Sequence, residues 1–199
     1  MSICGYCKDN DEMVYLNDDI DSFDFEASLA KLSSQRREQA LRFRSERDRK
    51  LCALAYILLC EGLRKEYGIT ELPVFDYGEH GKPFIIGHPD IHFNISHCRE
   101  AVVCVLSDRP VGVDVEGMRG YRESLVRYTM NDAEISEIEQ SACPEIEFIR
   151  LWTRKEAVMK CYGSGITNDI KHVLEHNSLE TTTITSADNR YVYSVCYGN

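Results

Sequence analysis

The sequence lacks the features that mark membrane, secreted or fibrous proteins. Its longest apolar run, Leu51–Cys60, has ten residues, about half of what a membrane-spanning helix needs. The N-terminal region has neither the basic start nor the apolar stretch of a secretory signal. Proline is scarce, with 5 residues, and the 199 residues include only 12 glycines, so neither collagen-like repeats nor wholesale disorder is expected. These absences predict a folded protein that neither enters nor crosses a membrane.

Cysteine is frequent but has no recognisable framework. The nine cysteines are an odd number and are not spaced as in a disulfide-stabilised protein. Cys4 and Cys7 have the two-residue spacing of a zinc-binding pair, but no second pair at matching spacing exists, which favours unligated thiols. We therefore expect a reduced, cytosolic protein.

Positive charge is also in short supply, but it is concentrated. Lysine and arginine total 23 against 33 acids, a net charge of −10, which argues against general nucleic-acid binding because that affinity comes from many cationic contacts. Residues 1–30 carry eight acids and one base, whereas residues 31–65 carry ten bases and four acids. Such a basic patch can receive a phosphorylated small molecule or an acidic partner, or it can be a solvated helix face.

The first half of the chain predicts helices followed by strands. Helices are expected over residues 26–42 and 46–67, the second one stopping at Gly68. Short apolar runs broken by turn residues follow, and they predict a sheet of short strands: LPVF, PFII, IHFNIS, AVVCVLS and VGVDV. The turn SDRP before the last run is where we place a soft domain boundary.

The second half repeats this order. Asn131 and Glu134 have the spacing of a helix N-cap and its reciprocal acid. Pro144 suits the first turn of another helix, which we expect to end at Gly163. The runs LETTTITS and RYVYSVCY predict a terminal hairpin. The complete order predicts an α+β fold.

Two acids share one face of the strand VGVDVEG. Asp114 and Glu116 are two residues apart, so their side chains project to the same side while Val113 and Val115 project to the other. Paired carboxylates in an apolar strand suit Mg²⁺ that shares its shell with a phosphate. Many exposed strands carry such a pair without any metal, so the motif alone leaves both interpretations open.

The segment FIRLWTRKEAVMKCYGSGI places aromatic and charged residues in one row of a helix. Phe148, Trp152, Glu156 and Lys160 are spaced four apart. A carboxylate beside aromatic rings loses hydration, which a metal or the adjacent ammonium would offset. An ordinary surface ion pair explains the same spacing.

Two further segments could serve a ligand. The strand IHFNISHC ends with Asn94, Ser96 and His97, where side chains can reach a cleft. A histidine beside a serine and a basic patch could hold a phosphate, although a histidine there is more often structural or merely exposed. A Cys98 nucleophile with His97 as base is disfavoured, because adjacent strand residues point to opposite faces. Lys82 in the turn GKP could bind a ligand or simply close the turn.

Taken together, the motifs FRSERDRKL, GKPFI, FNISH, VGVDVEG and WTRKEAVMKCYGSGI resemble the signature series of the 4′-phosphopantetheinyl transferases, specifically the larger type that activates peptide and polyketide synthases. The match extends over roughly residues 36–166. The resemblance implies a magnesium-dependent enzyme that moves the phosphopantetheine arm of coenzyme A onto a serine of an apo acyl or peptidyl carrier protein and releases adenosine 3′,5′-bisphosphate.

The resemblance also assigns roles to the candidate residues. The implied metal ligands are Asp114, Glu116 and Glu156. Lys160 would contact the pyrophosphate and stabilise the leaving group, and Glu156 is the implied acceptor of the serine proton, directly or through a metal-bound water. The implied contacts of the adenine nucleotide and its 3′-phosphate are Arg47, Lys82, Ser96 and His97.

The family fold is a pseudo-dimer of two similar α+β halves with coenzyme A in the cleft between them. The boundary at SDRP agrees with halves of residues 1–108 and 109–199. A monomer would suffice, because the duplication supplies both walls of the cleft. For the carrier protein we expect an apolar docking face made of Met118, Tyr121, Leu125 and Tyr128.

One position departs from the family pattern. Many relatives have an arginine where this chain has Leu51, so the 3′-phosphate contacts are the least secure part of the transfer, and Arg49 or Lys50 would have to substitute. Two other functions use the same residues: magnesium-dependent hydrolysis of a nucleotide pyrophosphate, and binding of coenzyme A or a carrier without reaction. The pathway served and the breadth of carriers accepted are not specified by any motif.

Overall fold

The computed structural model describes residues 13–165, 169–175 and 179–199. Cys4 and Cys7 lie outside these residues. Within them, helices and short antiparallel strands occur in the order helices, strands, helices, strands, after one early strand. The α+β class predicted from the sequence is confirmed.

The N-terminal half packs a long helix against one face of a three-stranded sheet. Strands β1 (Met13–Asn17), β5 (Val102–Ser107) and β4 (His92–His97) pair antiparallel in the order β1-β5-β4. Helix α3 (Glu46–Tyr67) begins at the capping Ser45 and ends at the left-handed Gly68. Its apolar face meets Tyr15, Phe93 and Leu106 of the sheet in the largest buried cluster.

The segment before α3 corrects one prediction. The expected single helix over residues 26–42 is wrong, because the chain there forms α1 (Phe25–Ser28), a 3₁₀ turn at Leu29–Lys31 and α2 (Ser34–Arg42). Leu32 has extended backbone and the Ser33 hydroxyl accepts the Arg36 amide. Serine competes with the helix ladder and starts a new helix.

A small ribbon connects α3 to the sheet. Strands β2 (Phe75–Tyr77) and β3 (Pro83–Ile85) pair with each other and not with the larger sheet. The tight turn between them, which contains Gly81 with φ 80°, presents Lys82. The single run of sheet strands predicted from Leu72 to Glu116 is therefore divided among separate sheets.

The C-terminal half repeats the combination of a sheet and a long helix. Strands β6 (Val111–Gly117), β8 (Tyr191–Tyr197) and β7 (Glu180–Thr185) pair antiparallel in the order β6-β8-β7. Helix α6 (Pro144–Tyr162) crosses this sheet and ends at the left-handed Gly163. The terminal hairpin and this helix are confirmed.

Two shorter helices pack against the first half of α6. They are α4 (Glu123–Thr129) and α5 (Asp132–Gln140), and α5 begins with the predicted capping box of Asn131 and Glu134. A 3₁₀ turn at Ile170–His172 lies between α6 and β7. No helix among the described residues is long and apolar enough to cross a membrane.

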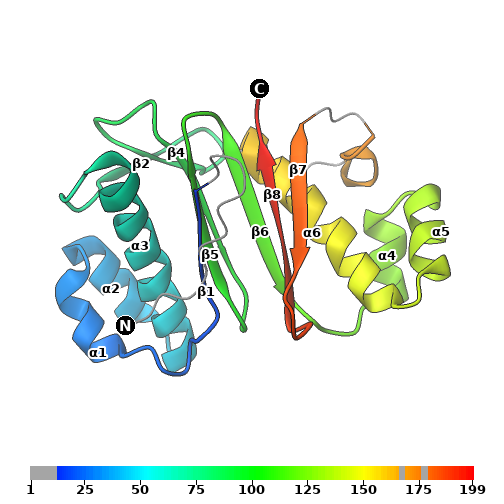
Figure 1. Cartoon of the computed structure of the whole chain (residues 1–199), viewed down its shortest axis with the longest axis horizontal. Coiled ribbons are helices and arrows are strands. Elements are labelled where there is room, and N and C mark those ends of the chain that lie inside the picture. Colours follow the sequence, from blue (N-terminus) through cyan, green and yellow to red (C-terminus); the bar gives the residue numbers. More distant parts are fainter. Residues whose placement is uncertain (1–12, 166–168, 176–178) are drawn as a thin grey trace.

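The two sheets lie between the two long helices (Figure 1). One face of the first sheet is covered by α3, and its opposite face, including Val103 and Val105, packs on Val113 and Val115 of the second sheet. The far face of the second sheet is covered by α6 through a cluster that includes Ala157 and Cys196. Strand β6 is thus enclosed on both faces.

Candidate active site between β6 and α6

Helix α6 lies unusually close to β6 because Gly112 has no side chain. A Cβ atom at Gly112 would fall 2.1 Å from the Ala157 carbonyl oxygen and 2.3 Å from the Cys161 nitrogen, both in the backbone of α6. This close approach brings Glu156 and Lys160 of the helix beside Asp114 of the strand. Asp114 and the two valines beside it face opposite sides, as the strand alternation predicts.

Asp114 is the most enclosed acid of the group. Its carboxylate is 6% exposed, and Oδ1 accepts hydrogen bonds from Lys160 Nζ at 2.6 Å and from the Ser96 hydroxyl at 2.9 Å. The second oxygen, Oδ2, is buried and has no hydrogen-bond partner within the described residues. A buried carboxylate oxygen left unpaired costs free energy unless a ligand satisfies it.

Glu116 and Glu156 lie within the electrostatic field of Asp114. Burial raises the pKa of both glutamates, and the negative charge of Asp114 raises each pKa further. Glu116 also accepts a hydrogen bond from the Trp152 indole at 3.3 Å and pairs with Arg119 at 3.1 Å. Three mutually repelling carboxylates are an arrangement that a bound cation would stabilise.

The donor chemistry of this group fits a hard divalent cation. All three side chains offer carboxylate oxygens, the ligands that Mg²⁺ prefers, and the unpaired Asp114 Oδ2 supplies one that the protein itself does not use. As they stand, no three histidine, cysteine, aspartate or glutamate side chains in the described ranges are gathered closely enough to hold a metal. The fit thus rests on donor type and on the orphaned oxygen.

His97 lies at the end of β4, between the two halves. Loss of hydration lowers the pKa of His97 most, and the positive charge of Lys160 lowers it further. The charge of Asp48, in the first turn of α3, acts in the opposite direction. Charges of both halves, Asp48 on α3 and Lys160 on α6, therefore act on His97.

Arg47 is held in place by neighbours in its own half. Its guanidinium donates to the Arg99 carbonyl at 3.0 and 2.8 Å and pairs with Asp21 at 2.8 Å. These bonds attach the start of α3 to the turn after β4, the same turn that follows His97. No described hydrogen bond or ion pair joins Arg47 to the carboxylate group itself.

Leu51, where many relatives have an arginine, is buried. Leu51 is 5% exposed and belongs to the apolar cluster under the first sheet, so it does not face a ligand. Of the two neighbouring bases, Arg49 donates to the Phe43 carbonyl and Lys50 to the Asp21 carbonyl. Lys50 and Arg47 therefore both bond to Asp21, Lys50 to its carbonyl and Arg47 to its carboxylate.

Lys82 reaches from the β2–β3 turn into the other half. Its ammonium donates to the carbonyl oxygens of Val111 and Cys161, both at 2.9 Å, and burial lowers its pKa. A cavity of about 280 Å³ lies beside it and is lined from both halves. The lining includes Lys82, Asn94, Glu156, Lys160 and Gly163.

Sequence reasoning placed Asn94 beside a cleft together with Ser96 and His97, but it missed the bond that Asn94 makes to β6. Its side-chain oxygen accepts the Val113 amide at 2.9 Å, which joins β4 to β6. The available signal was the two-residue spacing of Asn94 and Ser96, which places two polar side chains on one face of a largely apolar strand.

Comparison with known proteins agrees with these motifs. The model of the 4′-phosphopantetheinyl transferase superfamily matches residues 110–197. A 4′-phosphopantetheinyl transferase of Bacillus subtilis is 29% identical over 158 residues, which are 77% of this chain and 70% of that protein. The 4′-phosphopantetheinyl transferase gsp of Aneurinibacillus migulanus is 30% identical over 160 residues, 78% of this chain and 67% of that protein. The chain belongs to the 4′-phosphopantetheinyl transferase superfamily. The 4′-phosphopantetheinyl transferase Sfp of Bacillus subtilis strain 168 is 27% identical over a similar span.

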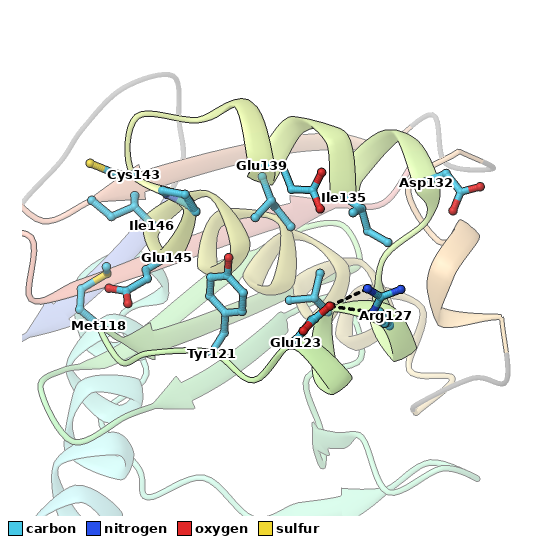
Figure 2. A pocket seen from close by; sticks show the side chains of 13 residues that line it. Met118, Tyr121, Glu123, Arg127, Asp132, Ile135, Glu139, Cys143, Glu145 and Ile146 are labelled. Atoms are coloured by element: carbon cyan, nitrogen blue, oxygen red, sulfur yellow. Dashed lines mark hydrogen bonds and ion pairs between the residues drawn. The ribbon is translucent and has the colours of Figure 1, made fainter.

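This phosphopantetheinyl transferase carries two grooves beside α4, and acids predominate in the lining of only one of them. The first, about 740 Å³, contains Arg119 and Arg122 together with the exposed Leu125 and Tyr128. The second, about 980 Å³, lies between α4, α5 and the start of α6. Figure 2 shows carboxylates around this second groove, and its acidic lining residues are Glu123, Asp132, Glu139 and Glu145. Only the first groove also reaches Glu116 and Trp152 of the candidate site.

Proposed function

We propose that this protein transfers the 4′-phosphopantetheine group of coenzyme A to a serine hydroxyl of an apo acyl or peptidyl carrier protein. The products are the holo carrier protein and adenosine 3′,5′-bisphosphate. The observation that carries the proposal is the group formed by Asp114, Glu116, Glu156 and Lys160, on a chain of this superfamily. Acids that can hold Mg²⁺ and an ammonium that can offset phosphate charge suit a magnesium-dependent transfer of a phosphoryl group.

The halves of residues 1–108 and 109–199 form the pseudo-dimer in this proposal. Each half supplies a three-stranded antiparallel sheet and one long helix, α3 or α6. The cavity beside Lys82 draws its lining from both halves, which supports a cleft for coenzyme A between them. A single chain then provides both walls, and a monomer is sufficient.

Asp114, Glu116 and Glu156 would hold Mg²⁺. When bound, the ion would supply positive charge that offsets the charge of the pyrophosphate of coenzyme A. The serine oxygen forms a bond to the β-phosphorus, and the bond from that phosphorus to the oxygen of the leaving 3′,5′-bisphosphate breaks. Lys160 stabilises the negative charge that remains on this leaving group.

Glu156 takes the serine proton in this proposal. A general base works best when its pKa lies near the operating pH, and burial together with the Asp114 charge raises the pKa of Glu156 in that direction. The pair of Lys160 with Asp114 keeps the ammonium on the strand side of the helix. Proton acceptor and leaving-group cation thus come from successive turns of α6.

Coenzyme A would be held at its other end by residues of the N-terminal half. His97 and Arg47 would face the 3′-phosphate, and Lys82 would lie along the adenine nucleotide. The positive charge of Lys160, which lowers the pKa of His97 after the larger effect of burial, supports a place for His97 near the phosphate groups. Lys82 uses two of its three N–H donors on carbonyl groups, which leaves one for a ligand.

The carrier protein would dock in the groove that contains Arg119 and Arg122. The predicted apolar residues Leu125 and Tyr128 are 39% and 69% exposed there, and Tyr121 lines the same groove. Met118 instead lines the acidic groove on the other side of α4. Positive charge around exposed apolar groups suits an acidic carrier, and the groove leads to Glu116.

Intact-mass spectrometry tests the function directly. Several apo carrier proteins are incubated with this protein, coenzyme A and Mg²⁺, with an EDTA control. The expected result is a mass gain of about 340 Da that requires the divalent ion. Hydrolysis of coenzyme A at the same rate without a carrier would instead show a pyrophosphatase. Binding of coenzyme A with no gain on any carrier would show a protein that binds without reacting.

A further inference from the structure

The two sheets meet at their edges, and side chains replace the missing backbone ladder. Strand β4 ends one sheet and β6 ends the other. The Val113 amide donates to Asn94 Oδ1 at 2.9 Å, and the Val115 amide donates to Ser96 Oγ at 3.3 Å. Unpaired edge amides need acceptors when they are buried. Asn94 and Ser96, 7% and 6% exposed, therefore join the halves.

The two residues differ in what else they touch. Asn94 makes its described side-chain bond to the strand backbone alone. The Ser96 hydroxyl also donates to Asp114 Oδ1 at 2.9 Å and accepts from Lys160 Nζ at 3.1 Å. One hydroxyl thus connects the strand amide, the acid and the ammonium.

These bonds use the whole hydrogen-bonding capacity of Ser96. A serine hydroxyl has one donor hydrogen and two acceptor lone pairs. Asp114 takes the hydrogen, while Val115 and Lys160 take the lone pairs. No donor remains for an anionic phosphate oxygen, which can only accept.

The bonds from Ser96 and Lys160 hold one carboxylate oxygen of Asp114 and leave the other without a hydrogen bond in the described part of the chain. Oδ1 is held by both Ser96 and Lys160, and Oδ2 is buried without a partner. Hydrogen bonds to metal-ligating carboxylates orient them and raise the affinity of the site.

We infer that Ser96 is a positioning residue of the proposed transfer: its hydroxyl holds Asp114 Oδ1 so that Oδ2 is presented to the divalent cation. The inference rests on the proposed function and changes the role of Ser96 from a phosphate contact to a partner of the metal ligand. Asn94 provides the tie between the sheets alone.

The test compares Ser96→Ala with Asn94→Ala, because each removes one acceptor of a β6 amide but only Ser96 touches Asp114. The probe is Mn²⁺ alone, with its Kd taken from the paramagnetic resonance signal of the free ion. Ser96→Ala should raise this Kd about tenfold or more, whereas Asn94→Ala and the hydroxyl-keeping Ser96→Thr should stay within about twofold of the wild type. Both alanine variants should lower Tm.

Binding of coenzyme A in EDTA separates the two roles of Ser96. The inference expects Ser96→Ala to bind coenzyme A like the wild type without a divalent ion. A variant that loses coenzyme A affinity and keeps its Mn²⁺ affinity overturns the inference in favour of a phosphate contact. Equal weakening of Mn²⁺ binding by Asn94→Ala overturns it as well, since loosening of the sheet junction would then be the cause.

Two further outcomes are distinguishable. If Ser96→Ala does not fold, Ser96→Cys takes its place, because a thiol is a weak donor and acceptor and should raise the Mn²⁺ Kd in the same direction. A wild-type protein that transfers no phosphopantetheine and binds no Mn²⁺ overturns the proposed function and the inference with it. Wild-type activity with an unaffected Ser96→Ala Mn²⁺ affinity overturns the inference alone.

Discussion

In the proposed mechanism, Glu156 is the residue on which the chemistry depends most strongly. It is assigned both a metal-binding and a proton-accepting role, and an amide can neither carry the charge nor take the proton. Glu156→Gln should lower the carrier-modification rate by about 100-fold or more, with Tm essentially unchanged. The measurement is the initial rate of the mass gain at saturating coenzyme A.

Glu147 provides a matched control on the same helix. It pairs at 3.9 Å with Arg150 and lies more than two turns from Glu156. Glu147→Gln should keep the wild-type rate. A Glu156→Gln enzyme that works as fast as Glu147→Gln would remove Glu156 from the mechanism.

Lys155 precedes Glu156 in the sequence but faces the opposite direction. It is 0% exposed, pairs with Glu134 at 2.8 Å and donates to the carbonyls of Ile170 and Lys171. Lys155→Met would leave a buried carboxylate and two carbonyls without their partner, so the free energy of unfolding should fall by about 3–5 kcal/mol. Urea unfolding measures this change.

The exposed ion pair of Arg127 and Glu123 is the control for the buried pair of Lys155 and Glu134. Arg127 and Glu123 are 73% and 76% exposed, and Arg127→Met should cost under about 1 kcal/mol. The double variant Lys155→Met with Glu134→Gln should recover part of the loss, since no buried charge is then left alone. Equal costs for Lys155→Met and Arg127→Met would show that the buried pair adds nothing.

At the level of single residues, the sequence could predict which side chains gather at the candidate site but not their bonds. Strand alternation places Asp114 and Glu116 on one face, and helical spacing places Glu156 beside Lys160. Neither pattern indicates that Lys160 would pair with Asp114 instead of Glu156, because that choice depends on how closely α6 approaches β6.

The contact between α6 and β6 is set by a glycine. At Gly112, a methyl group would meet backbone atoms at 2.1 and 2.3 Å, which cannot move without shifting the helix. Gly112→Ala should lower the free energy of unfolding by about 3 kcal/mol and should also slow transfer, because Glu156 would move away from Asp114. Chemical denaturation and the transfer assay measure the two effects.

Gly78 is the control for this substitution. An added Cβ there would find only the Lys82 carbonyl at 3.6 Å, an ordinary contact. Gly78→Ala should change stability by less than about 1 kcal/mol. If Gly112→Ala is no more harmful than Gly78→Ala, then the helix does not depend on this close approach.

Helix α4 separates the two grooves and offers a test of carrier docking. Leu125 and Tyr128 are exposed in the arginine-containing groove. Replacing both by aspartate should raise the carrier KM about tenfold or more while leaving the coenzyme A KM unchanged, because acidic groups would replace apolar contacts and repel an acidic carrier. Leu41→Asp, at an exposed position on α2, should leave both constants unchanged. A carrier KM that moves equally in both proteins would place the docking surface elsewhere.

Element boundaries followed the local signals where those signals were strong. The capping box at Asn131 and the glycines at the ends of α3 and α6 were predicted and are confirmed. The break at Ser33 was not predicted, because residues 26–42 are helix-forming on average and the break depends on one hydroxyl. Local sequence patterns also could not predict which strands belong to the same sheet. Ser107 and Val111 are joined by a three-residue turn, yet β5 and β6 belong to different sheets.

At the scale of the whole molecule, the two halves share the buried cluster between their sheets. Val103 and Val105 of the first sheet pack on Val113 and Val115 of the second, and Asn94, Ser96 and Lys82 add polar ties across the junction. The change of sheet between β5 and β6 therefore does not divide the buried surface of the chain.

This shared cluster predicts a single cooperative unfolding transition. Calorimetry should give a calorimetric enthalpy equal to the van't Hoff enthalpy, and Val105→Ala and Val195→Ala, one in each sheet, should each lower the same transition by about 2 kcal/mol. The fragments 1–108 and 109–199, expressed separately, should not fold, since each exposes the apolar face that the other covers. Two separate transitions, or a fragment with a cooperative melt of its own, would contradict this prediction. The proposed cleft for coenzyme A would then lie between two units free to move, and the arrangement of the residues proposed to line it would depend on the ligand and not on the fold.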